Sequence, residues 1–258
     1  MIYVCIPSYN EAETIGLVLW KIRKVFEEFP REYQILVADD GSTDRTAETL
    51  EPYTKVLPLT VIRWETRRGY AHSVEALLHQ ALELSDRPKR DSALLMHADF
   101  THGPQYLPDF VRRLDSGADL VVGEGILSGE PSAARRLVRH WAPRLLRRAV
   151  RVRGVTDTVS GFVAFRLMVL RQALTAGGRG AATGGTGRRP LTASGWAANA
   201  ELIGRAAHSA RRIETVRVLE RHDLRTRPSR IRPWETLREL WRSGTQLKRR
   251  QRAAGAAS

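Results

Sequence analysis

Short apolar runs alternate with longer stretches of helical periodicity along the first half of the chain. Five apolar runs predict buried strands, at residues 2–6, 33–38, 56–62, 93–96 and 119–123. Between them, apolar residues recur on one helical face and predict helices at residues 13–29, 72–84 and 107–114. A further helix is predicted to extend to Leu50, with Ser42 or Thr43 as its N-cap. Strands that alternate with helices predict an α/β fold, in which a mostly parallel, Rossmann-like sheet is flanked by helices.

The pattern changes after Gly129. Residues 135–153 carry eight arginines and no acidic residue among apolar side chains, and residues 232–252 are basic and amphipathic in the same way. Between these segments, a stretch rich in Gly, Thr and Ala predicts a loop at residues 177–195. A helix is predicted at residues 196–207 and a strand at residues 213–219. We therefore divide the chain into residues 1–128, residues 129–230, and a C-terminal basic helix and tail at 231–258.

The charge balance narrows the classes of partner. The chain holds 42 Lys and Arg against 28 Asp and Glu, a net charge of +14. Such a surface favours an anionic partner: nucleic acid, a phospholipid surface or a phosphorylated substrate. The single cysteine, Cys5, excludes an intrachain disulfide and is expected in the core. No apolar run reaches the length of a membrane span and the N-terminus lacks signal-peptide form, so we expect a cytoplasmic protein whose membrane contact, if any, is peripheral.

Polar clusters follow three of the predicted strands, at residues 7–11, 39–44 and 97–102. Because the carboxyl ends of parallel strands meet at one edge of a sheet, we expect the three clusters to converge. In the last cluster, Asp99 stands between two histidines. A carboxylate at this place can hold a divalent cation, which in turn can hold a ligand's phosphates. The alternative is a surface turn whose aspartate caps the next element.

Together with Asp157-Thr-Val-Ser-Gly-Phe and Ser229-Arg230, these clusters resemble the inverting GT-A glycosyltransferases of family 2. Within that family the chain is most similar to the polyprenol-phosphate sugar transferases of the dolichol-phosphate mannose synthase type. The resemblance covers residues 2–230 and is strongest at 7–11 and 37–44. It implies a GT-A fold in which residues 1–128 bind a nucleotide-diphosphate sugar. Residues 129–230 would then form the acceptor side of the same domain, with the C-terminal helix at its interface.

The resemblance also implies a set of residues that contact the nucleotide sugar: Pro7, Tyr9, Glu11, Ala38, Asp40, Ala98, Asp99, Arg225 and Arg230. Carboxylates suit this task because nucleobases and ribose offer N–H and O–H donors. Asp157 and Glu201 are the catalytic candidates, since either could orient or deprotonate an acceptor. The alternatives are a turn cap for Asp157, a solvated helix face for Glu201 and general surface basicity for the arginines.

Three positions depart from the family's pattern. His97 stands where the first carboxylate of an Asp-x-Asp motif is usual, so the implied metal ligands are His97 and Asp99. Imidazole suits Mn²⁺ better than Mg²⁺, and the alternative is a weakened or lost metal dependence. Val163 stands where an arginine commonly follows Ser-Gly-Phe, and Glu124-Gly125 replace the usual Ser-Arg or Thr-Arg. The loss of two cations favours a changed acceptor or donor.

The function we expect is inverting transfer of a sugar to a polyprenyl phosphate. The alternatives are a family 2 glycosyltransferase with a soluble small-molecule acceptor such as a specialised metabolite, an inactive relative that binds nucleotide, and a non-catalytic basic anion-binding protein. The two basic segments, with Trp141, Trp234 and Trp241, suit an anionic membrane surface, or else are ordinary amphipathic helices packed on the sheet. No nucleic acid partner is expected, because aromatic residues are not interleaved with the basic ones as stacking platforms.

Overall fold

The computed structural model describes residues 1–128, 152–175 and 190–221, together with Leu137, Trp141, Leu145, Trp234, Leu237, Arg238, Leu240, Trp241, Arg242 and Thr245. Several features predicted from the sequence lie outside these residues. They are the arginines Arg225 and Arg230, most of the basic segments 135–153 and 232–252, and most of the loop at 177–195.

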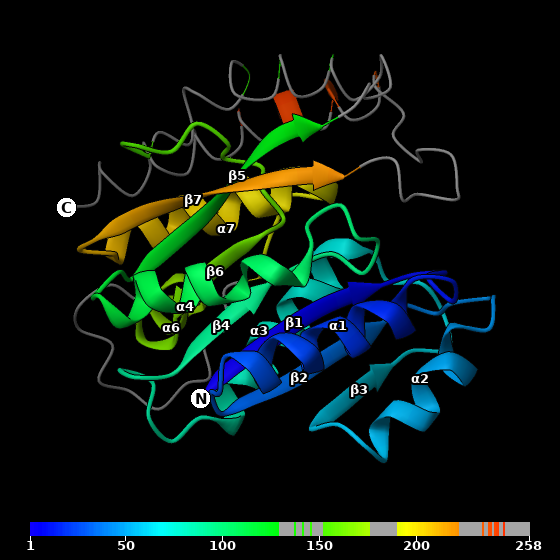
Figure 1. The fold of residues 1–258 in the computed structure, drawn as a ribbon. Coiled ribbons are helices and arrows are strands. Elements are labelled where there is room, and N and C mark those ends of the chain that lie inside the picture. The colour runs from blue at the N-terminus through cyan, green and yellow to red at the C-terminus, as the bar shows by residue number, and fades with distance from the viewer. Residues whose placement is uncertain are drawn as a thin grey trace.

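A seven-stranded sheet in the order β3-β2-β1-β4-β6-β5-β7 forms the centre of the described fold (Figure 1). Its strands are β1 (Ile2–Ser8), β2 (Tyr33–Asp39), β3 (Leu59–Arg63), β4 (Ser92–Leu95), β5 (Leu120–Ser128), β6 (Val163–Arg166) and β7 (Ile213–Arg221). β6 runs antiparallel to its neighbours β4 and β5, and the other neighbouring pairs are parallel. The prediction of a mostly parallel α/β sheet is confirmed.

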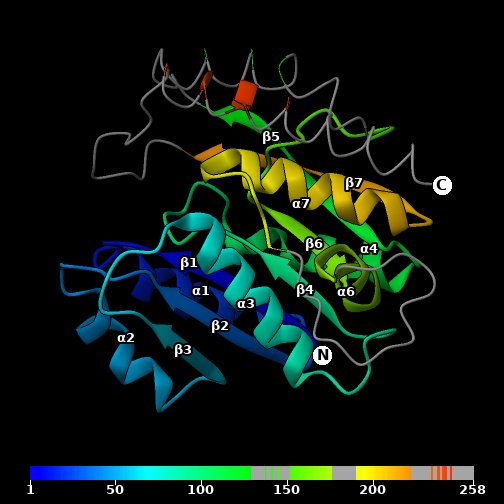
Figure 2. The ribbon, with the colours of Figure 1, turned by 180° about the vertical axis from the view of Figure 1, so that it is seen from behind.

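Helices cover both faces of the sheet. On one face lie α1 (Ile15–Glu28), α2 (Thr46–Thr54), the short helix η1 (Pro104–Tyr106) and α4 (Leu107–Asp115). The other face, seen in Figure 2, is covered by α3 (Tyr70–Leu84), α6 (Leu167–Leu174) and α7 (Gly195–Ser209). This arrangement places a packed hydrophobic core on each side of one sheet, and leaves the ends of the strands open for a site.

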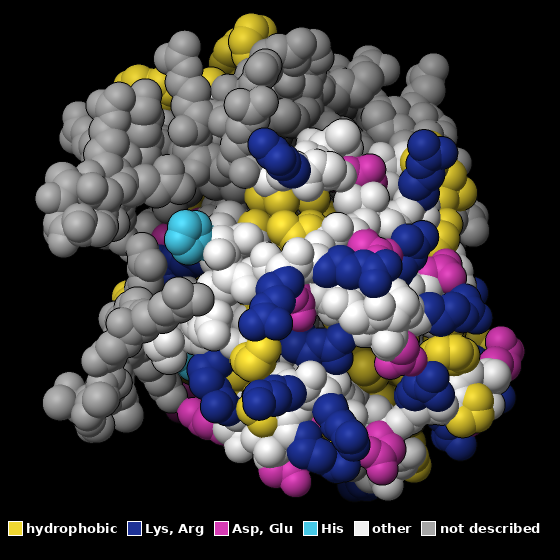
Figure 3. Space-filling model, turned by 90° about the vertical axis from the view of Figure 1, so that its left-hand side faces the viewer, with side chains coloured by type: hydrophobic (Ala, Val, Ile, Leu, Met, Phe, Trp, Pro, Cys, Tyr) yellow, Lys and Arg dark blue, Asp and Glu magenta, His cyan; other side chains and the backbone are white. Residues whose placement is uncertain are grey.

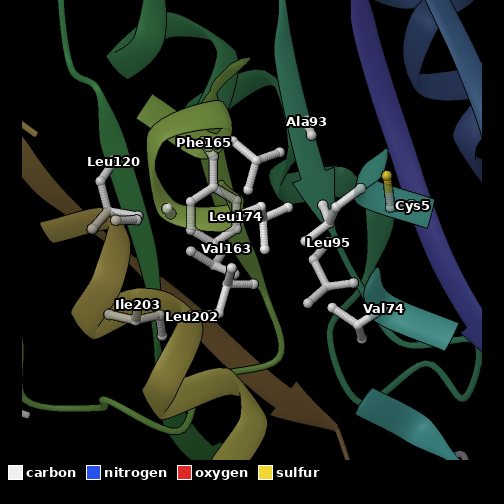
Figure 4. Packing of buried hydrophobic residues seen from close by; sticks show 14 of the residues in the cluster. Cys5, Val74, Ala93, Leu95, Leu120, Val163, Phe165, Leu174, Leu202 and Ile203 are labelled. Atoms are coloured by element: carbon white, nitrogen blue, oxygen red, sulfur yellow. The ribbon is translucent and has the colours of Figure 1, made fainter. Parts of the chain in front are cut away.

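The two cores follow from the alternation of side chains along each strand. In β1, Tyr3 and Cys5 belong to the core under α3, whereas Val4 and Ile6 belong to the core under α1. Cys5 is fully buried, as predicted. Figure 4 shows the α3 side, where Val163 and Phe165 of β6 lie among side chains that include Leu202 and Ile203 of α7.

Several element boundaries differ from the prediction. Helix α2 begins at Thr46, and Ser42 and Thr43 do not cap it but bond to Asn10 of the neighbouring cluster. β3 begins at Leu59, so that Val56 and Leu57, with which the predicted strand starts, lie before it. No strand or helix is predicted at residues 163–174, where the structure has β6 and α6, because the apolar residues on both sides of Arg166 do not distinguish a short buried strand from a buried helix.

The surface is basic without being uniformly so. On the side of the molecule that faces left in Figure 1, Lys and Arg side chains are spread among Asp and Glu side chains, as Figure 3 shows. Of the helices that the structure describes, none combines the length and the apolar character that crossing a membrane requires.

Candidate active site

The first two polar clusters meet at the carboxyl ends of β1 and β2. These strands pair in parallel, so that Pro7 lies beside Ala38. The Asn10 backbone N–H donates to Ser42 Oγ at 2.9 Å, and the Thr43 N–H donates to Asn10 Oδ1 at 2.8 Å. Asn10 adopts a positive φ of 53°, a conformation that costs energy outside glycine and is held here by these bonds. Residues 7–11 and 39–44 therefore form one bonded unit.

Asp40 anchors a loop over the second cluster. Its carboxylate is 3% exposed and accepts hydrogen bonds from the backbone N–H groups of Arg68, at 2.7 Å, and Gly69, at 2.9 Å. The Arg67 guanidinium lies 4.1 Å from the centre of the Tyr9 ring. Tyr9 and Asp40, two predicted nucleotide contacts, are thus brought together beneath residues 66–69.

The second cluster contains a glycine, Gly41, for a steric reason. Its φ is +65°, and a Cβ at this position would lie 2.6 Å from the Arg67 nitrogen and 2.7 Å from the Thr66 carbonyl carbon. Both neighbours are backbone atoms, which cannot move aside as a flexible side chain can. The turn after Asp40 therefore requires glycine for its conformation and for its space.

The third cluster follows β4, which pairs in parallel with β1 on the side opposite β2. Asp99 is 7% exposed, and its Oδ1 accepts the Thr101 N–H at 3.1 Å. Phe100 between them has a positive φ of 56°. Asp99 therefore shapes a tight turn at the strand end, and Ala98 beside it is packed into the core.

His97 reaches across to the Ser160-Gly161-Phe162 segment. A Cβ at Gly161 would lie 1.9 Å from the Nε2 atom of His97, so that the glycine leaves the space which the imidazole fills. The His97 ring is stacked between two others, with centroid distances of 5.9 Å to Tyr70 and 6.1 Å to His102. His97, which stands where the resemblance implies an aspartate, is therefore held in the site by its neighbours.

This row of rings continues through the molecule. The His102 ring lies 5.3 Å from Phe162, which packs on Phe110 of α4 at 4.4 Å. At its other end, the Tyr70 hydroxyl donates to Asn199 Oδ1 of α7 at 2.9 Å. Burial raises the pKa of Tyr70, so that its hydroxyl stays protonated as the donor of this bond.

A small pocket opens beside His97. Its lining includes His97, His102, Asp157, Ser160, Trp196 and Glu220. Asp157 is half-buried, and its Oδ1 accepts the Val159 N–H at 3.2 Å. The predicted catalytic carboxylate therefore faces a pocket and also caps a turn, so that the two interpretations of this residue are compatible.

Glu201 lies elsewhere. It is 1% exposed, forms an ion pair with Arg205, and accepts the backbone N–H groups of Thr192, at 2.8 Å, and Ala193, at 2.9 Å. The alternative of a solvated helix face is wrong. Glu201 is not among the residues that line the pocket, and its bonds hold residues 190–193 against α7.

Glu220, Trp196 and Ser160 were not among the predicted site residues, and His102 had no predicted role. Glu220 follows the same rule as the three clusters, since it lies near the carboxyl end of a parallel strand, β7. The signal for Trp196 is weaker. It depends on where the first turn of α7 points, which only the packed structure gives.

The donor atoms near β4 fit a divalent cation in part. Within the described residues, no group of three or more His, Cys, Asp or Glu side chains is arranged to hold a metal ion. His97 and Asp99 supply one imidazole and one carboxylate, a combination that suits Mn²⁺ better than Mg²⁺. A phosphate-bearing ligand would have to complete the coordination, as is common where a cation bridges protein and phosphate.

Comparison with known proteins identifies proteins that are similar to this chain in sequence. Dolichol-phosphate mannosyltransferase of Pyrococcus furiosus is 29% identical over 172 residues, which is 65% of this chain and 46% of that protein. Undecaprenyl-phosphate 4-deoxy-4-formamido-L-arabinose transferase of Pseudomonas aeruginosa is 30% identical over 151 residues, 58% of this chain and 41% of that protein. The chain spans less than half the length of these curated relatives.

Solved structures share the fold. Glucosyl-3-phosphoglycerate synthase from Mycobacterium tuberculosis, in complex with Mn²⁺, uridine-diphosphate-glucose and phosphoglyceric acid, has a TM-score of 0.65 at 17% identity, covering 96% of this chain and 79% of that one. S. aureus TarS 1-349 has a TM-score of 0.55 at 17% identity, covering 83% and 57%. At these identities the likeness shows a GT-A fold alone. The family model of glycosyl transferase family 2 matches residues 3–174, and the chain belongs to that family.

Proposed function

We propose that the chain transfers a sugar, with inversion, from a nucleotide-diphosphate sugar to an acceptor bound in the pocket beside Asp157. The observation that carries the proposal is the meeting of three strand ends, those of β1, β2 and β4, at one edge of the sheet. Ligands of open α/β sheets bind at such edges. The Mn²⁺ and uridine-diphosphate-glucose complex of the mycobacterial neighbour supports a donor and a cation of the same kind.

On the donor side, Tyr9 and Asp40 offer a nucleobase an aromatic face and a hydrogen-bond acceptor. Pro7 and Ala38, adjacent in the sheet, would form the floor under the nucleoside. Glu11 is half-buried nearby, where its carboxylate already accepts the Thr14 hydroxyl at 3.1 Å. We assign these residues to the nucleoside, and Ala98 and Asp99 to the diphosphate.

The metal ligands of the proposal are His97 and Asp99. A cation held there would neutralise the charge that develops on the leaving diphosphate. Arg225 and Arg230, which lie outside the described residues, are proposed to serve the same phosphates. Arginine suits this task because its planar fork of donors matches phosphate oxygens.

Inversion requires the acceptor oxygen to lie behind the anomeric carbon, in line with the leaving group. Asp157 faces the pocket in which that oxygen would sit, and we assign to it the orientation or deprotonation of the acceptor. Glu201 is engaged by Thr192, Ala193 and Arg205. We therefore propose that Glu201, our other catalytic candidate, is a positioning residue for the segment 190–193.

Two acceptor classes meet this description. The names of the archaeal and bacterial relatives support a polyprenyl phosphate at an anionic membrane surface. The exposed Trp141, Trp234 and Trp241 are also suited to such a surface. A soluble small-molecule acceptor is favoured by Val163, which is fully buried in β6, and by Gly125, because neither offers a cation to an acceptor phosphate.

Binding and product analysis together test the proposal. We expect one nucleotide among UDP-, GDP- and dTDP-sugars to raise the melting temperature, more so with Mn²⁺ than with EDTA. The transferred sugar should have the anomeric configuration opposite to that of the donor by NMR. A panel in which no sugar nucleotide stabilises the chain or is consumed would overturn the proposal. Co-sedimentation with anionic liposomes, measured against salt, separates a membrane-bound enzyme from one with a soluble acceptor.

A further inference from the structure

One arginine side chain covers the aromatic ring that the proposed function gives to the nucleobase. The guanidinium carbon of Arg67 lies 4.1 Å from the centre of the Tyr9 ring. Because non-bonded heavy atoms are already in contact at about 4 Å, no planar base fits between the guanidinium and this face of the ring. The Arg67 side chain is 59% exposed, so it covers the ring from the solvent side, from which a ligand would enter.

The same guanidinium faces the carboxylate that the proposed function gives to the base. The Nε atom of Arg67 lies 3.9 Å from Asp40 Oδ2. Asp40 Oδ1 accepts the Arg68 N–H at 2.7 Å and the Gly69 N–H at 3.2 Å, whereas Oδ2 accepts the Gly69 N–H at 2.9 Å. Since a carboxylate oxygen can accept two hydrogen bonds, Oδ2 is the atom with room for an N–H of a base. Arg67 therefore lies against both proposed base contacts.

The backbone on either side of Arg67 is held at the end of β2. Before it, the Trp64 N–H donates to the Asp39 carbonyl at 3.2 Å, and after it the Arg68 N–H donates to the Asp40 carboxylate. The exposed side chain of Arg67 is not restrained in this way, and exposed side chains change rotamer within picoseconds to nanoseconds. A ligand can therefore displace the guanidinium while residues 64–69 stay in place.

We infer that Arg67 competes with the nucleobase, and that the donor binds only by displacing its guanidinium from Tyr9 and Asp40. The inference rests on the proposed function and concerns the regulation of its donor site. An entering base replaces the cation–π contact and the ion pair with its own stacking and its own hydrogen bond. After transfer, the returning guanidinium favours release of the nucleoside diphosphate, a step that limits the rate of many enzymes.

Nucleoside affinity tests the competition without involving the phosphates. The nucleoside of the donor found by thermal shift, which is uridine, guanosine or thymidine, is titrated into the wild type and into Arg67→Ala by NMR. We expect Arg67→Ala to bind the nucleoside about fivefold more tightly, because the base no longer has to break a cation–π contact and an ion pair, each weak at an exposed site. An unchanged or weaker affinity overturns the inference.

Arg68→Ala is the matched control. It removes the same charge from the next residue but keeps the backbone N–H that Asp40 accepts. The Arg68 guanidinium carbon lies 5.7 Å from the centre of the Trp64 ring, a different ring from the one that Arg67 covers. We expect this variant to bind the nucleoside as the wild type does. Equal tightening in both variants would attribute the effect to net charge and overturn the role of Arg67.

Titration with the nucleoside diphosphate separates competition from two other roles of an arginine. If Arg67 bound the phosphates, Arg67→Ala would lose affinity for the diphosphate and keep the wild-type affinity for the nucleoside. If Arg67 clamped the base, the variant would bind both ligands more weakly. Either result overturns the inference.

The proposed function is judged by a separate result. It fails if no sugar nucleotide stabilises the wild-type chain, whereas nucleotide binding without a gain in nucleoside affinity on Arg67→Ala defeats only this inference. Thermal melts of both variants provide the check on folding. We expect wild-type melting temperatures, because the side chains of Arg67 and Arg68 are exposed.

Discussion

The proposed donor side, at the ends of β1 and β2, and the proposed acceptor side, around Asp157, are built in different ways. At the ends of β1 and β2, glycine and polar residues are fixed by backbone constraints, as the contact of Gly41 with the Arg67 backbone shows. Around Asp157, by contrast, side chains define the surroundings: Glu124 accepts the Thr156 N–H, and the Glu220 carboxylate fills the space over Gly125. A site built from turns therefore depends on backbone geometry, whereas one built from side chains can be altered in charge without a change in the fold.

The strongest test of the donor side is Asp99→Ala. We expect turnover to fall at least about 10³-fold, because this carboxylate is the one acidic group in residues 97–102 and would face the diphosphate. The loss is measured as donor consumption with Mn²⁺, alongside a thermal melt. Asp109→Ala is the control, because the Asp109 side chain is half-buried on α4 and pairs with Arg112 of the same helix. Normal turnover by Asp99→Ala would show that Asp99 holds neither metal nor diphosphate.

On the acceptor side, Glu201→Ala should act on stability first. Removing this carboxylate leaves Arg205 buried, with a side chain 7% exposed, and orphans two backbone N–H groups. We expect the free energy of unfolding to fall by about 3 kcal/mol, as for other broken buried ion pairs. Denaturant unfolding measures the change.

Two further variants separate the catalytic and the positioning roles of Glu201. Glu201→Leu with Arg205→Leu removes both charges, and we expect it to recover part of the lost stability. Leucine cannot accept the Thr192 and Ala193 N–H groups, so the double variant tests the charge pair alone. Glu201→Gln keeps an acceptor for those N–H groups but removes the base, so its activity should persist if Glu201 only positions the segment 190–193. A stably folded Glu201→Gln variant without activity would instead assign Glu201 to the chemistry.

The metal preference of the donor side is tested at the histidine of the third cluster. His97→Asp restores the carboxylate pair that the family usually has. Because Mg²⁺ prefers oxygen ligands, we expect the ratio of Mg²⁺-supported to Mn²⁺-supported turnover to rise about tenfold. Initial rates in each metal, after removal of bound ions with EDTA, provide the measurement. Full wild-type activity in EDTA would remove the metal from the mechanism.

The fold could be predicted from the sequence to the extent that local patterns determine it. Strands β1, β2 and β4 are apolar runs closed by polar clusters, and parallel pairing alone brings those clusters to one edge. β6 could not be predicted, because it is only four residues long and apolar residues resume directly after Arg166 in α6. The length of a run shows burial but not where a strand gives way to a helix.

For the site residues, too, local sequence patterns predict some positions and not others. Asp40 and Asp157 are found at strand ends and in motifs, where sequence position determines spatial position. Glu220 lines the pocket and contacts Gly125 and His102, which are both far from it in the chain. Such a contact depends on the order of strands in the sheet, and no local pattern encodes that order.

The smallest expected effect concerns the bonds that join the two donor clusters. Burial pushes the pKa of Asp44 upward, but hydrogen bonds from Thr46 and Ala12 outweigh it and leave the pKa below its ordinary value. Such a carboxylate stabilises the fold above its unfolded pKa of about 3.9, and the contribution is lost as the pH falls through the lower folded value. Asp44→Asn should therefore be less stable than the wild type at pH 7, by about 0.5 kcal/mol because Asp44 is exposed to solvent.

The pH dependence of that difference distinguishes a charge effect from a packing effect. Denaturant unfolding of both proteins is measured at pH 7 and again near pH 3. The gap should narrow at the lower pH, because a protonated Asp44 side chain is uncharged, like the amide that replaces it in the variant. A gap that stays constant with pH would mean that the carboxylate charge contributes nothing. In that case the joining of residues 7–11 to 39–44 rests on Asn10 and Ser42, and the donor side would owe its rigidity to neutral hydrogen bonds.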